Sequence, residues 1–296
     1  MRARDYRNEL RKQIKNLRLM DDRFMNVCLK DDVESVQLIV RIILERPDLV
    51  VTSVHTQEVM SNLVGRNVEF DISATDGEGK IYDIEIQREN AGAGRKRARY
   101  HSSVIDSNEL RKGRRFDDLP ETFVIFITEH DPLGAGQPIY HIDRRIKETN
   151  ELFGDEAHIV YVNGSCMDLK TELGKLMFDF SCKDPDRMHY KPLADKVRYF
   201  KKNRKGLEIM AGTLDQWAKE ITDEAREEGI EKGIEKGIKK GIEKGIEKGR
   251  KKGIKENKVE VALKLIQRGG MAVEEIADLL GLTVKSVQKL AAHKAA

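Results

Sequence analysis

Two acidic residues and one amide stand at positions from which they can act on one ligand. Asp71 lies in a run of alternating polarity, and Glu85 and Gln87 lie in a second such run after the turn sequence at 76–80. In an antiparallel hairpin the sequence numbers of two facing residues always add up to the same value. A turn centred on Glu78 predicts that this value is 156. Asp71 is therefore expected to face Glu85 across the hairpin.

Facing carboxylates destabilise a strand pair unless a cation lies between them. Carboxylate oxygens suit Mg²⁺, Mn²⁺ or Ca²⁺, and this hairpin contains no cysteine. The hairpin therefore predicts a site for a hard divalent cation. The competing interpretation is a solvent-facing hairpin, on which charges alternate with a buried face.

The flanking sequence predicts the elements that would hold this hairpin. Residues 33–44 have helical periodicity that stops at Pro47, and apolar runs at 122–128 and 157–163 are typical of buried strands. Further helical patterns cover roughly 95–111, 169–180 and 192–200. This order predicts a mixed sheet flanked by helices, an α/β domain spanning residues 1–200.

A tetrapeptide repeat, Gly-Ile-Glu-Lys, begins at Gly229 and continues with one glycine every four residues. Its isoleucines would form a stripe that winds by about 40° per unit around a helix. Each glycine costs about 0.8–1 kcal/mol relative to alanine inside a helix. We expect residues 201–258 to be a semi-helical, charged connector that needs a partner or a second copy to be stable.

Residues 259–296 regain helical periodicity and are broken at two glycine turns. The segment EEIADLLGLTVKSVQKL has the helix, turn and second helix of a helix-turn-helix unit. Many small helical modules share this pattern, so DNA reading, a helical cap and an oligomerisation element all stay open for this tail.

Positive charge is concentrated locally, although 54 Lys+Arg nearly balance 51 Asp+Glu in the whole chain. Residues 226–258 hold 12 basic against 7 acidic residues, and residues 95–115 hold 8 against 2. Such patches fit a polyanion, and a solvated helix face is the alternative. The candidates for binding DNA phosphates open the second patch: Arg95, Lys96, Arg97 and Arg99.

The three cysteines are far apart and suggest neither a disulfide framework nor a zinc site. No apolar run approaches the length of a membrane span, and the first residues are polar. The sequence therefore predicts a soluble, cytoplasmic protein without membrane contact.

The segment VEFDISATDGEGKIYDIEIQ, with the helix before it and RKRARYHSSVIDSNELRKG after it, resembles the PD-(D/E)XK nuclease family transposases, also called the recombination-promoting nuclease/putative transposase family. The resemblance covers roughly residues 20–163. It implies a restriction-endonuclease-like core followed by a long charged helix or repeat and a small helical tail.

The resemblance also implies roles for single residues. Asp71 and Glu85 would be the metal ligands, with Mg²⁺ as the expected ion, and Gln87 stands where the wider superfamily usually has lysine. Glu34 is the candidate for an additional catalytic acid, in competition with three others: Asp31, Asp32 and Glu58. A bound cation would polarise a phosphate oxygen and activate water for in-line attack.

The predicted function is therefore metal-dependent cleavage of DNA, linked to recombination or mobile elements, by a dimer formed through the repeat. Two rivals stay open. One is a catalytically decayed nuclease fold that binds DNA, which the missing lysine favours. The other is an interaction protein whose repeat is the functional part. RNA is a third, weaker possibility, as the substrate in place of DNA.

Overall fold

The computed structural model of the protein describes residues 3–60 and 66–295. They form two compact units, Met1–Gln216 and Trp217–Ala296, which are described separately below. Helix α7 (Arg204–Arg268) begins in the first unit and ends in the second.

The first unit is built on a six-stranded mixed sheet, as the sequence predicted. The strand order is β1-β2-β3-β4-β6-β5; β1 to β3 pair antiparallel, β3, β4 and β6 pair parallel, and β5 pairs antiparallel with β6. Two strands, β1 and β5, were not predicted from the sequence. The bounds of the strands are β1 (Val51–Met60), β2 (Val68–Asp76), β3 (Ile81–Gln87), β4 (Thr122–Thr128), β5 (Ile139–Ile142) and β6 (Ala157–Asn163).

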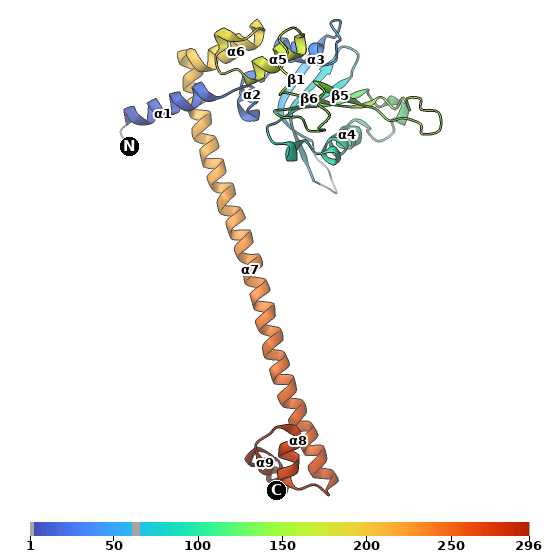
Figure 1. The fold of residues 1–296 in the computed structure, drawn as a ribbon, viewed down its shortest axis with the longest axis vertical. Coiled ribbons are helices and arrows are strands. Elements are labelled where there is room, and N and C mark those ends of the chain that lie inside the picture. The colour runs from blue at the N-terminus through green and yellow to red at the C-terminus, as the bar shows by residue number, and fades with distance from the viewer. Residues whose placement is uncertain (1–2, 61–65, 296) are drawn as a thin grey trace. The chain divides into compact units, whose positions relative to one another are not determined.

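Helices cover both faces of this sheet (Figure 1). Helix α4 lies on one face, over a core that includes Phe70, Val104 and Phe126. Helices α3, α5 and α6 gather on the other side, where α3 contacts β1 and α5. The helices of this unit that precede α7 are α1 (Ala3–Asn16), α2 (Asp22–Leu29), α3 (Val33–Ile43), α4 (Arg95–Glu109), α5 (Glu172–Ser181) and α6 (Lys191–Lys202), with short 3₁₀ turns at η1 (Asn90–Ala93), η2 (Phe116–Asp118) and η3 (Pro185–Arg187).

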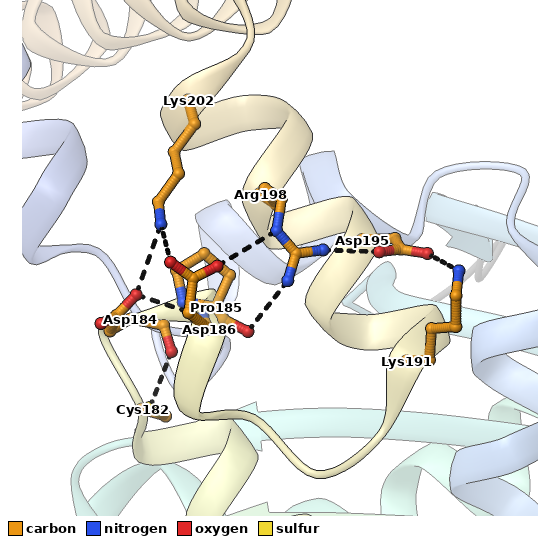
Figure 2. A network of polar contacts seen from close by, with 8 residues as sticks. All are labelled: Cys182, Asp184, Pro185, Asp186, Lys191, Asp195, Arg198 and Lys202. Atoms are coloured by element: carbon orange, nitrogen blue, oxygen red, sulfur yellow. Dashed lines mark hydrogen bonds and ion pairs between the residues drawn. The ribbon is translucent and has the colours of Figure 1, made fainter.

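Ion pairs on the surface hold α6 against η3 (Figure 2). Lys202 pairs with Asp184 and Asp186, and Arg198 reaches Asp186 at 3.3 Å and also pairs with Asp195 at 2.6 Å. All of these side chains are largely solvent-accessible, so each pair contributes about 0–1 kcal/mol to stability. Their role is to fix the position of α6.

The second unit contains a small helical core at its carboxyl end. Helices α8 (Val273–Leu280) and α9 (Val284–Ala295) are joined by a turn in which Gly281 has a φ of +57°, a conformation that favours glycine. They pack against the end of α7 through four buried side chains, Ala262, Ile276, Ala277 and Val287. The repeat itself is continuous helix within α7, which is more regular than the semi-helical connector expected from its glycines.

Within the part of the chain that the structure describes, no helix combines the length and the apolar character needed to cross a bilayer.

A candidate metal centre between two diverging strands

The predicted register of the hairpin is confirmed where the strands pair. Ile72 lies opposite Ile84, a sum of 156. Beyond this pair, hydrogen bonds between side chains and the backbone connect the two strands. Glu85 Oε1 accepts a hydrogen bond from the backbone N–H of Asp71 at 3.1 Å, and Asp71 Oδ2 accepts one from the N–H of Ile86 at 2.9 Å. The two carboxylates therefore bridge strands that diverge here.

Strict alternation along β2 would place Phe70 on the face opposite the acidic residues, but the structure places it beside them. The Phe70 ring lies 5.4 Å from the ring of His101 on α4, and Asp83 contacts the same histidine. The divergence of β2 from β3 explains the difference, because alternation holds only while a strand keeps its pleat and its pairing. Phe70 thereby packs beneath α4 beside the acidic cluster.

A buried group of two carboxylates and one imidazole forms the centre of the site. Asp83, Glu85 and His101 are each 2% exposed or less. His101 Nδ1 lies 2.8 Å from Asp83 Oδ2 and 3.9 Å from Glu85 Oε1. One ligand atom from each residue fits within a 4.8 Å span, which is compact enough for all three to reach one metal ion.

Arg97 reaches into this group from the first turn of α4. Its Nη2 donates to Glu85 Oε2 at 2.7 Å, its Nη1 donates to the Gly92 carbonyl at 3.0 Å, and its Nε donates to His101 Nε2 at 3.2 Å. Gln87 lies against Gly92, where an added Cβ would come within 1.9 Å of Gln87 Oε1. Gly92 therefore gives Gln87 the space to lie beside the arginine.

The surroundings of the site disfavour the ionised form of its carboxyl groups. Burial raises the pKa of Asp71 to about 6 and, with the charges of Asp83 and Asp71 added, the pKa of Glu85 to about 8. Burial also raises the pKa of Asp83 well above its usual range and lowers that of His101. A bound cation would reverse these effects by stabilising the ionised carboxylates.

The residues present fit a divalent cation. Asp83 Oδ1 is a buried carboxylate oxygen without a hydrogen-bond partner, although buried polar atoms are normally paired. Carboxylate oxygens with one imidazole form a donor set that suits Mn²⁺ and related divalent ions as well as Mg²⁺. This orphaned oxygen is the observation that favours a ligand over a structural ion pair.

The predicted site residues fall into two groups. Asp71, Glu85 and Gln87 come together, and Arg97 joins them by pairing with Glu85. The remaining predicted cations, Arg95, Lys96 and Arg99, lie exposed on α4. Glu34 in the first turn of α3 and Asp31 before it are exposed, and Glu58 on β1 is half-buried. Asp32 is buried and pairs with Lys196 at 3.4 Å.

Sequence reasoning missed four residues of the site: Asp83, His101, Asp22 and Asn26. Asp22 and Asn26 on α2 act on Asp71, whose pKa the Asp22 charge raises and an Asn26 hydrogen bond lowers. Arg97 and His101 are four residues apart, so a helix places them on one face. That spacing was the available signal for His101.

One of the comparisons with known proteins identifies a family for this chain. Residues 50–246, about two thirds of the chain, match the family model described as PD-(D/E)XK nuclease family transposase. The match includes all of β1 to β6, and therefore the carboxylates at the diverging strands. Neither the curated proteins nor the solved structures yielded a match to the chain.

Proposed function

Because the chain belongs to the PD-(D/E)XK nuclease family transposases, we propose that it is a divalent-metal-dependent endonuclease that hydrolyses phosphodiester bonds in DNA. The orphaned Asp83 oxygen beside Glu85 is the observation that carries the proposal, because it marks a buried anionic site built for a cation. The biological setting that we propose is recombination or the movement of mobile elements.

Asp71 and Glu85 are the proposed metal ligands, with Asp83 and His101 as further donors. The ion, Mg²⁺ or Mn²⁺, would supply Lewis acidity toward the scissile phosphate. Glu85 is already occupied at both oxygens, by the Asp71 N–H and by Arg97. We therefore propose that an incoming cation competes with Arg97 for Glu85.

Arg97 also supplies the positive charge that a lysine at position 87 would have provided. Gln87 carries no charge, so its amide can orient water only by hydrogen bonds. Arg97 is 40% exposed at its side chain and lies beside the same carboxylates, which places a permanent positive charge where the phosphate would arrive. Arg95, Lys96 and Arg99 would bind the flanking backbone phosphates without reading sequence.

The test is cleavage of supercoiled plasmid by the full chain with Mg²⁺, Mn²⁺, Ca²⁺ or EDTA. Replacing Asp71 or Glu85 with alanine should lower the rate by about 100-fold or more, because each change removes a ligand of the charge-stabilising ion. Glu69→Ala is the matched control, since Glu69 is exposed on the same strand. It should cleave as the unmodified chain does.

A catalytically decayed fold that binds DNA is the second candidate, and Gln87 favours it. Calorimetric titration with Mn²⁺, combined with the cleavage assay, distinguishes the nuclease from the decayed fold. Metal-dependent nicking that is lost in both alanine variants supports the nuclease. Mn²⁺ binding and DNA binding without nicking under any metal would replace the nuclease by the decayed fold. Single-stranded RNA in the same assay decides between the two nucleic acids.

A further inference from the structure

The repeat in α7 presents a row of large apolar side chains to solvent. The row consists of Ile230, Ile234, Ile238, Ile242, Ile246 and Ile254, each 50–66% exposed. Exposed isoleucines at regular spacing along one helix mark a contact surface. We propose that this surface binds a second copy of the chain, with the two repeats parallel and in register.

The repeat sorts four residue types into four rows. Successive residues are turned by about 100° around a helix, so residues four apart form a slowly winding row. Around the circumference the order is lysine, glycine, isoleucine and glutamate. The Gly–Ile face is therefore flanked by a row of positive charge beside the glycines and a row of negative charge beside the isoleucines.

This order is complementary to itself in only one orientation. Across the two-fold axis of a parallel pair the rows of the second helix run in the opposite order, so isoleucine meets glycine on both sides of the contact. In an antiparallel pair each row meets its own kind, which brings glycine to glycine and isoleucine to isoleucine. Size therefore selects the parallel pair.

The glycine row gives the isoleucines of the partner a place to pack. A Cβ added at Gly233, Gly237 or Gly241 would meet no atom within 4 Å, so the row is an open groove. Rows of residues four apart are the ridges and grooves that interlock when two helices cross at about −50°. Such a crossing joins two or three repeat units rather than forming a long coiled coil.

The repeat also carries like charges four residues apart, which destabilise a helix on its own. Lysine recurs at every fourth position from Lys232 to Lys248, and glutamate is repeated at Glu231 and Glu235 and again at Glu243 and Glu247. Two departures limit the contact: Lys239 replaces glutamate in the third unit, and Arg250 interrupts the isoleucine row. The contact is therefore centred within residues 229–248. This inference stands whether or not the chain is a nuclease.

The first experiment measures the mass of the full chain by sedimentation at micromolar concentration. The unmodified chain should sediment at twice 33.8 kDa. Gly241→Leu fills the groove and should raise the dissociation constant about 100-fold or more, even though leucine is the better helix former. Gly212→Leu makes the same change in α7 outside the repeat, where Gly212 is also unobstructed, and should leave the dimer intact. A monomeric unmodified chain, or a Gly241→Leu chain that dimerises equally well, would overturn the proposal.

The second experiment determines orientation from distances between spin labels. Labels at Glu227→Cys and, separately, at Lys255→Cys are placed in a chain carrying Cys166→Ser. In a parallel pair, equal positions at both ends should lie about 20 Å apart. Separations of about 40 Å at both ends would mean an antiparallel pair and would refute the packing of isoleucine against glycine. Cys28 and Cys182 are buried and serve as the unlabelled background.

Discussion

Two buried ionisable side chains in the first unit have opposite surroundings. Lys201 is 6% exposed, and its Nζ donates to three backbone carbonyls, those of Lys15, Leu17 and Lys183. Asp83 is fully buried, and its Oδ1 makes no hydrogen bond. The ammonium is completely satisfied, whereas the carboxyl is not.

We propose that this difference separates a structural group, Lys201, from a metal-binding one, Asp83. A buried ammonium that uses all three protons on carbonyls ties α6 to the end of α1 and to the segments that follow α1 and α5. A buried carboxyl group with an unbonded oxygen lowers stability, and a bound cation would offset that cost. Charge burial alone would not distinguish the two, whereas the count of satisfied atoms does.

The largest effect is expected from Lys201→Met. Methionine fills similar space but leaves three buried carbonyls without their donor, so we expect the free energy of unfolding to fall by about 3 kcal/mol. Urea titration followed by circular dichroism measures it. The adjacent Lys202→Met is the control, because Lys202 makes only the surface pairs of Figure 2 and should change stability by less than about 1 kcal/mol. Equal losses in both variants would contradict the assignment of Lys201 as a structural centre.

We expect Asp83→Asn to raise the free energy of unfolding, by less than Lys201→Met lowers it. Without metal, the amide avoids the cost of burying an ionisable carboxyl, so the variant should be more stable than the unmodified chain by about 2 kcal/mol at neutral pH. Mn²⁺ should raise the midpoint of thermal unfolding of the unmodified chain by more than it raises that of the variant. Asp184→Asn on the surface serves as the control. A destabilised Asp83→Asn chain would show that Asp83 is structural, as Lys201 is.

The strands that carry the site could be predicted because their patterns are local. The turn at 76–80 determines the hairpin register, and the register places Asp71 near Glu85. The apolar runs of β4 and β6 identify central strands, since both of their faces are covered. These parts of the fold follow from neighbouring residues alone.

The rest of the site depends on contacts between distant segments. Asp22 and Asn26 meet Asp71 only after α2 packs beside the sheet, and no spacing in the sequence encodes that approach. The contact between Arg97 and Glu85 also depends on how α4 lies over β3. Sequence reasoning assigned Arg97 to phosphates because charge is visible in a sequence, whereas the partner of a charge is not.

The smallest effect concerns the pH dependence of stability without metal, measured in EDTA. In the folded chain Glu85 keeps its proton up to a pKa of about 8, whereas the unfolded chain releases it near the usual value of 4.5. The folded state thus binds more protons between these values, so the free energy of unfolding should fall as pH rises from 6 to 8, by about 1 kcal/mol per pH unit at most. Above pH 8 the decline should level off. Glu85→Gln should remove most of this slope, and Mn²⁺ should oppose it, because a cation favours the ionised carboxylate. Equal slopes for Glu85→Gln and the unmodified chain would mean that other groups titrate in this range. Glu85 would then not be a buried carboxyl that lowers stability, unlike the satisfied Lys201.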